Sequence, residues 1–162
     1  MPPASNRRQI TIAVPSANLT LNLSQGESAE GWYKRANVGG YKSGGKTPQG
    51  ATKITRSNYK SFYVWAITTV VQKPQEVVFE RIKALVENNP LTQVSMLDEY
   101  EYIDILQSNI HNRVAAADSQ IIVAGIPQCL CAFNVLLQTD ENYKDYLGAG
   151  RWRLTFGLEE LI

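Results

Sequence analysis

The sequence predicts a mainly β fold of the α+β class: an antiparallel β-sandwich or split barrel with one flanking α-helix at about residues 75–88 and a long glycine-rich arm. Residues 9–14 and 18–24 alternate apolar with polar side chains, the period of a strand buried on one face. Only a short break at Pro15 separates the two runs, so we expect an antiparallel pair. The expected buried positions are Ile10, Ile12 and Val14 in the first strand and Leu19, Leu21 and Leu23 in the second.

A continuous apolar run at residues 62–71 predicts a central strand that is covered on both faces. The following segment, PQEVVFERIKALVENN, repeats apolar side chains at the spacing of an amphipathic helix. Pro74 suits the first turn of this helix, and the Asn-Asn-Pro sequence at residues 88–90 ends it. The positions on its apolar face are Val78, Ile82, Leu85 and Val86, with Phe79 at the edge.

The second half of the chain adds further strands to a single domain that spans residues 1–162. We expect a loop or short helix between residues 107 and 119, and a polar loop at residues 139–150. The expected strands are residues 92–97, 100–106, 120–124, 128–138 and the final segment from residue 151, in which Trp152, Leu154, Phe156 and Leu158 share one face.

The segment at about residues 25–60 has a different composition and is expected to form the extended basic arm. Seven glycines and Pro48 lie between residues 26 and 50, so we expect neither a regular helix nor a long strand there. Residues 1–60 hold nine Lys/Arg and two Asp/Glu, whereas residues 61–162 hold seven and thirteen. An acidic surface, either nucleic acid or a neighbouring copy, would suit such an arm. The expected contact residues of the arm are Trp32, Tyr33, Lys34, Arg35, Tyr41, Lys42 and Lys46.

One pattern in the arm is typical of nucleotide-binding proteins. Residues 40–47, GYKSGGKT, match the phosphate-binding loop G-x-x-x-x-G-K-[ST]. That loop requires a buried strand before it and a helix after it. The preceding residues do not form a buried strand pattern, and Pro48 and Gly50 oppose a helix. We therefore do not expect nucleotide binding here.

The remaining reactive side chains give no catalytic pattern. The acidic group Asp98, Glu99, Glu101 and Asp104 is interpreted as a solvated or partner-facing edge, not as a cation site. Cys129 and Cys131 are expected to be small buried side chains without a disulfide, and His111 is the only histidine. We expect no enzymatic activity, no cofactor and no metal.

No apolar run is long enough to cross a bilayer, and the first residues lack the apolar core of a signal peptide. These observations predict a soluble protein made in a cytoplasm.

Two segments carry a resemblance to a known group of proteins. VVFERIKALVENNP at residues 77–90 followed by VSMLDEY, and the final GRWRLTFGLEEL, are similar to the central helix and strands of tail and baseplate proteins of tailed bacteriophages, in the distal tail and tail-tube group. The resemblance implies a β-sandwich or split barrel with one flanking helix, and assembly into a ring. It also implies a virion structural protein of the tail, assembled in the host cytoplasm with other tail or baseplate proteins. The arm would then reach the next subunit and pair its basic residues with acids such as Asp98, Glu99 and Glu101.

A second hypothesis uses the same residues for a different partner. Basic and aromatic side chains interleaved from Trp32 to Tyr63 are also typical of a small β-barrel that binds single-stranded nucleic acid, a possible but less favoured function. On the assembly hypothesis, deletion of residues 26–50 is expected to leave the globule folded and to prevent assembly.

Overall fold

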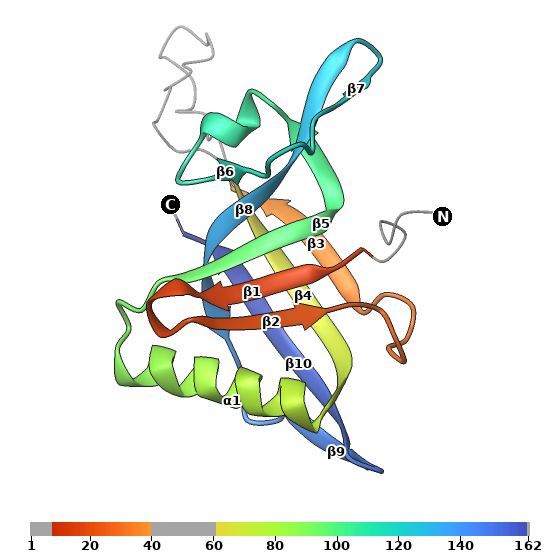
Figure 1. The fold of residues 1–162 in the computed structure, drawn as a ribbon, viewed down its shortest axis with the longest axis vertical. Coiled ribbons are helices and arrows are strands. Elements are labelled where there is room, and N and C mark those ends of the chain that lie inside the picture. The colour runs from red at the N-terminus through yellow and green to blue at the C-terminus, as the bar shows by residue number, and fades with distance from the viewer. Residues whose placement is uncertain (1–7, 40–60, 162) are drawn as a thin grey trace, which may run out of the picture.

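The computed structural model describes residues 8–39 and 61–161. It confirms the predicted fold class: the chain is mainly β, with an open antiparallel sheet and the helix α1 (Lys73–Asn88), as Figure 1 shows. The strand order in the sheet is β2-β1-β5-β8-β10-β4-β3, while β6 and β7 pair with β8 and β9 pairs with β10. The strands are β1 (Ile10–Val14), β2 (Leu19–Leu23), β3 (Tyr33–Val38), β4 (Phe62–Gln72), β5 (Val94–Asp104), β6 (Val114–Ala115), β7 (Ile121–Val123), β8 (Ile126–Gln138), β9 (Lys144–Gly148) and β10 (Arg151–Glu160).

The predicted pair at the N-terminus is present. β1 and β2 pair antiparallel with Ile10 opposite Leu23, and a 3-10 turn at Pro15–Ala17 joins them. Asn18 closes this turn in the left-handed backbone region, which asparagine tolerates better than most residues. The alternating apolar residues face the core, as expected: Ile10, Ile12, Val14, Leu21 and Leu23 are buried, and Leu19 is partly buried.

The sheet curves so that its two halves face each other around one core. In Figure 1, β1 and β5 cross in front of β4 and β10. The buried residues of β4 alternate along the strand, and Ala66 and Thr68 on its other face are exposed. The prediction that this strand is covered on both faces is therefore wrong. The continuous apolar run reflects outward-facing β-branched and aromatic residues that favour strand geometry, not a second covering layer.

Helix α1 follows β4 without a loop. Gln72 is the N-cap, and its backbone N–H donates to Oε1 of Gln75 at 3.3 Å in a capping box, with Pro74 in the first turn. Phe79 and Ile82 form the centre of its buried face at 1% and 0% exposure, so the prediction of Phe79 at the edge is wrong. The Phe79 ring lies 5.0 Å from that of Phe156 on β10, which seats the helix on the sheet.

Three other elements differ from the prediction. Residues 94–104 form one strand with an irregular register between Asp98 and Ile103, where two strands were expected. β9 lies within the predicted polar loop, because Lys144–Gly148 pairs with the start of β10. β3 lies within the predicted arm and pairs with β4 from Tyr33 opposite Ile67 to Val38 opposite Phe62. Deletion of residues 26–50 would remove β3, so a failure of that variant to assemble would not separate loss of the arm from loss of the sheet edge.

Replacing Ile82 by alanine tests the seating of α1. We expect the free energy of unfolding to fall by about 2–5 kcal/mol, because the side chain leaves a cavity in the core. Val77→Ala is the matched control on the same helix: Val77 is 51% exposed, and we expect a change within about 0.5 kcal/mol. Urea denaturation followed by circular dichroism measures both, and an equal effect of the two substitutions would contradict this packing.

Candidate functional site

The most concentrated polar group in the described residues surrounds Asp98 on β5. The Asp98 side chain is 0% exposed. Its Oδ2 accepts hydrogen bonds from the Tyr33 hydroxyl at 2.5 Å, from Trp65 Nε1 at 3.0 Å and from Arg35 Nη1 at 3.4 Å. Its Oδ1 accepts one from the backbone N–H of Tyr100 at 2.8 Å. Asp98 therefore joins β3, β4 and β5 inside the protein, and its assignment to a solvated or partner-facing edge is wrong.

Arg35 is placed by this carboxylate. Its side chain is 6% exposed, and its Nη2 lies 2.6 Å from Oε2 of Glu101, which is 48% exposed. The guanidinium also lies over the Tyr63 ring at 4.3 Å, a cation–π geometry. The sequence hypothesis paired Arg35 with acids of a neighbouring copy. Here Asp98 and Glu101 are its partners within one chain, because β3 folds back beside β4.

Trp32 and Tyr33 of the predicted arm likewise pack within the protein. Trp32 is 4% exposed and lies edge-on to Tyr100 at 5.4 Å, while Tyr33 stacks on Tyr100 at 4.8 Å. Burial, followed by the charge of Asp98, raises the pKa of Tyr33 far above its ordinary value. Burial also raises the pKa of Tyr100. These side chains hold the arm's first residues against the sheet.

A second buried ion pair was not predicted. Arg113 and Glu160 are each 1% exposed at the side chain; Nε donates to Oε2 at 2.6 Å and Nη2 to Oε1 at 2.7 Å. Glu160 also accepts from the backbone N–H of Tyr63 at 3.1 Å, and Arg113 donates to the Gln107 carbonyl at 3.0 Å. Such bidentate geometry is the strong form of an arginine–carboxylate pair. The signal was present in the sequence, because Glu160 continues the inward alternation of β10.

The other predicted residues lie apart from this site. Lys34 is exposed, Glu99 is half-buried, and Asp104 accepts a hydrogen bond from the backbone N–H of Leu106. His111 Nε2 contacts the Ser61 carbonyl at 3.0 Å. The remaining predicted contact residues of the arm, Tyr41, Lys42 and Lys46, lie outside the described residues, as does the phosphate-loop pattern at 40–47.

Cys129 and Cys131 are buried side by side, as predicted. They share the inner face of β8 and are free thiols with their Sγ atoms 3.7 Å apart. Burial, with the hydrogen bond to Cys129, raises the pKa of Cys131 to about 12. A thiol held in its neutral form is a poor nucleophile, so we interpret the two cysteines as side chains that pack in the core.

The chemistry of these clusters is structural. Throughout residues 8–39 and 61–161, every buried side-chain nitrogen or oxygen has a hydrogen-bond partner. The same residues contain no group of three or more His, Cys, Asp or Glu side chains arranged to hold a metal ion. The buried charges thus fix the positions of strands.

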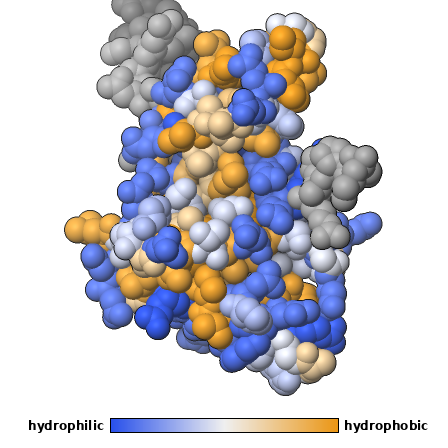
Figure 2. Space-filling view, in the orientation of Figure 1, coloured by the Kyte–Doolittle hydropathy of each residue, from blue (hydrophilic) through white to orange (hydrophobic). Residues whose placement is uncertain are grey.

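The outer surface carries a candidate functional feature at the hairpin of β7 and β8. Ala124 and Gly125 both have positive φ, the geometry of a two-residue type I′ turn, which sets a rigid hairpin. Around this turn the apolar side chains point into solvent, and Figure 2 shows them gathered at one end of the molecule. We call this surface the apolar tip: Ile121, Ile122, Val123 and Ile126, which are 39%, 70%, 54% and 48% exposed. The sequence predicted the strands but not that this end projects beyond the core.

Replacing Asp98 by asparagine tests the buried carboxylate. We expect a loss of about 3–5 kcal/mol in the free energy of unfolding, because Arg35 stays buried beside a neutral amide. Glu101→Gln removes the other, half-exposed partner of Arg35 and should cost about 1 kcal/mol or less. Chemical denaturation of both variants measures the difference. A tolerated Asp98→Asn substitution would contradict a central role for this group.

Alkaline pH tests the burial of Tyr33. The folded protein holds the Tyr33 proton more tightly than the unfolded chain does, since its pKa is raised above 10. The resulting stability is fully present below pH 10 and is lost as the pH rises further, because only the unfolded chain then releases the proton. We expect unfolding free energy to fall less steeply above pH 10 in Tyr33→Phe than in the wild type. Phenolate absorbance would report the same ionisation, and equal slopes would show that Tyr33 ionises freely in the folded state.

The described residues contain no helix long and apolar enough to cross a membrane. Comparison with protein-family models, with curated proteins and with solved structures found no match.

Proposed function

We propose that this protein is a non-enzymatic structural subunit that assembles with copies of itself. The observation that carries the proposal is the apolar tip. A soluble subunit rarely exposes contiguous β-branched side chains at a projecting end unless another surface covers them. Because the type I′ turn fixes the hairpin, the tip loses little conformational entropy on binding, which favours association.

We further propose that the assembly is a ring in the tail or baseplate of a tailed bacteriophage, built in the host cytoplasm. The support is the resemblance of residues 77–100 and 150–161 to that group. The mainly β fold with a helix on the sheet agrees with what the resemblance implies. Other tail or baseplate proteins would then be the outer partners of the ring.

Binding of single-stranded nucleic acid has less support. It requires aromatic faces that are free to stack on bases. Among the described residues of the predicted surface, Trp32 is 4% and Tyr63 is 8% exposed, and the Arg35 side chain is 6% exposed. These groups contribute to the core and the buried ion pairs, which leaves Lys34 as an exposed cation on β3.

Replacing Ile122 by aspartate tests the assembly. We expect the purified wild-type protein to form multi-subunit rings and Ile122→Asp to remain monomeric, because burying the aspartate in an apolar contact would remove water from its charge. Leu91→Asp is the control, since Leu91 is an exposed apolar residue away from the tip, at 90% exposure. Light scattering after size-exclusion chromatography and electron microscopy measure the outcome.

Two results would contradict the proposal. The first is a wild-type protein that stays monomeric at high concentration. The second is a wild-type protein that binds single-stranded DNA or RNA with strong salt dependence while the Ile122→Asp variant binds equally well.

A further inference from the structure

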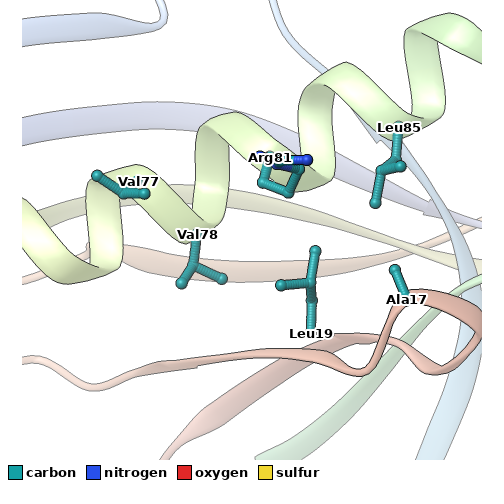
Figure 3. A pocket seen from close by; sticks show the side chains of 6 residues that line it. All are labelled: Ala17, Leu19, Val77, Val78, Arg81 and Leu85. Atoms are coloured by element: carbon teal, nitrogen blue, oxygen red, sulfur yellow. The ribbon is translucent and has the colours of Figure 1, made fainter.

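A second apolar surface lies on the far side of the molecule from the tip. Helix α1 and the β1–β2 hairpin border a groove of about 330 Å³. In Figure 3, Val78 and Leu85 point from the helix toward Leu19 and Ala17 on the opposite wall. Val77 and Arg81 complete the lining on the helix side. We call this the α1–β2 groove.

The tip and the α1–β2 groove cannot cover each other within one copy. Figure 1 places the β7–β8 hairpin at one end of the longest axis, whereas α1 lies in the opposite half, above the β9–β10 hairpin. In the same orientation, Figure 2 shows apolar surface where α1 borders β2 as well as at the hairpin. One surface projects and the other is hollow, so the two complement each other in shape and both are apolar.

The charges around the two surfaces are also complementary. Arg81 is exposed at the groove and makes no ion pair with any residue in the described parts of the chain. Near the tip, Asp118 is exposed, and Asp104 lies opposite Gln128, which in turn lies opposite Ile121. The sequence from 114 to 143 contains no Lys or Arg. The apolar tip, which carries no basic residue and has Asp118 just before it, therefore suits an apolar groove bordered by the exposed Arg81 guanidinium.

We propose that the α1–β2 groove of one copy receives the β7–β8 tip of the next copy, with Arg81 facing Asp118 or Asp104 across the contact. This inference rests on the proposed self-assembly and specifies its geometry. The contact joins two different surfaces, so it is heterologous and each copy keeps one free tip and one free groove. Repetition of a heterologous contact closes into a ring or continues as a filament, whereas pairing of two tips would stop at a dimer.

Mixing two interface variants tests this geometry. Ile122→Asp inactivates the tip and leaves the groove intact, while Val77→Asp inactivates the groove and leaves the tip intact. Both sites are more than half exposed, at 70% and 51%, so both variants should fold. We expect each variant alone to be monomeric and the equimolar mixture to form a one-to-one dimer, joined by the one intact tip and the one intact groove. Sedimentation velocity resolves monomer from dimer, and circular dichroism checks folding.

The outcomes separate this inference from the proposed function. A wild-type protein that is monomeric removes both. A wild-type protein that assembles, with a mixture that stays monomeric, overturns the tip-in-groove contact but not self-assembly. Assembly by Val77→Asp alone, or a tip bound only by a different protein, would also overturn it.

A charge reversal gives a second readout. Arg81→Glu is expected to weaken assembly at least tenfold at low salt, and Arg81→Glu combined with Asp118→Arg to restore most of it. No weakening by Arg81→Glu would remove Arg81 from the contact. If the double variant fails, the same reversal at Asp104 decides between the two carboxylates, and failure of both would exclude the proposed charge pairing.

Discussion

The fold depends on the burial of one carboxylate. Asp98 has four hydrogen-bond donors and lies at 0% exposure, where an unpaired charge would be very costly. Its donors come from β3, β4 and the following part of β5, so satisfying the carboxylate requires the sheet to curve until these strands meet. Hydrophobic burial drives the collapse of the chain. The Asp98 carboxylate then favours the one curvature of the sheet that brings its four donors together. The irregular register of β5 after Asp98 turns the Tyr100 backbone N–H toward it.

A single aromatic ring connects the two buried ion pairs. Tyr63 lies between the guanidinium groups of Arg35, at 4.3 Å, and Arg113, at 4.8 Å, and it also packs on Phe133. Both cations lie over the ring, and the Glu160 carboxylate also accepts a hydrogen bond from the Tyr63 backbone N–H. Removal of one charged partner would leave the other charge buried without a partner. The effects of substitutions in this group on the free energy of unfolding should therefore not be additive. The polar interior of this protein is thus a continuous group that crosses from β5 to the end of β10.

The sequence was sufficient for elements whose pattern is local. The alternation of β1, β2 and β10, the helix between Pro74 and Pro90 and the burial of Cys129 and Cys131 follow from side-chain period alone. It was insufficient wherever a distant partner decided the outcome. β3 carries arginine, lysine and asparagine and has glycines on both sides, so it resembles a loop until β4 and Asp98 pair with it. The acidic group at 98–104 resembles a surface because the donors that bury Asp98 lie up to 65 residues away. The exposure of the apolar tip also could not be predicted. An apolar strand pattern does not show whether other parts of the protein cover that strand.

The two thiols on β8 have a consequence for how the protein can be observed. Cys129 and Cys131 lie in the core, and burial raises the pKa of Cys131 so that its neutral form is strongly favoured. A soluble thiol reagent can therefore modify them only when β8 separates from its neighbours. When the reagent reacts more slowly than β8 recloses, the modification rate reports the population of the open state. When the reagent reacts faster than β8 recloses, it reports the rate of opening. Thiol modification therefore reports how often the sheet opens at β8, the strand that continues from the β7–β8 hairpin.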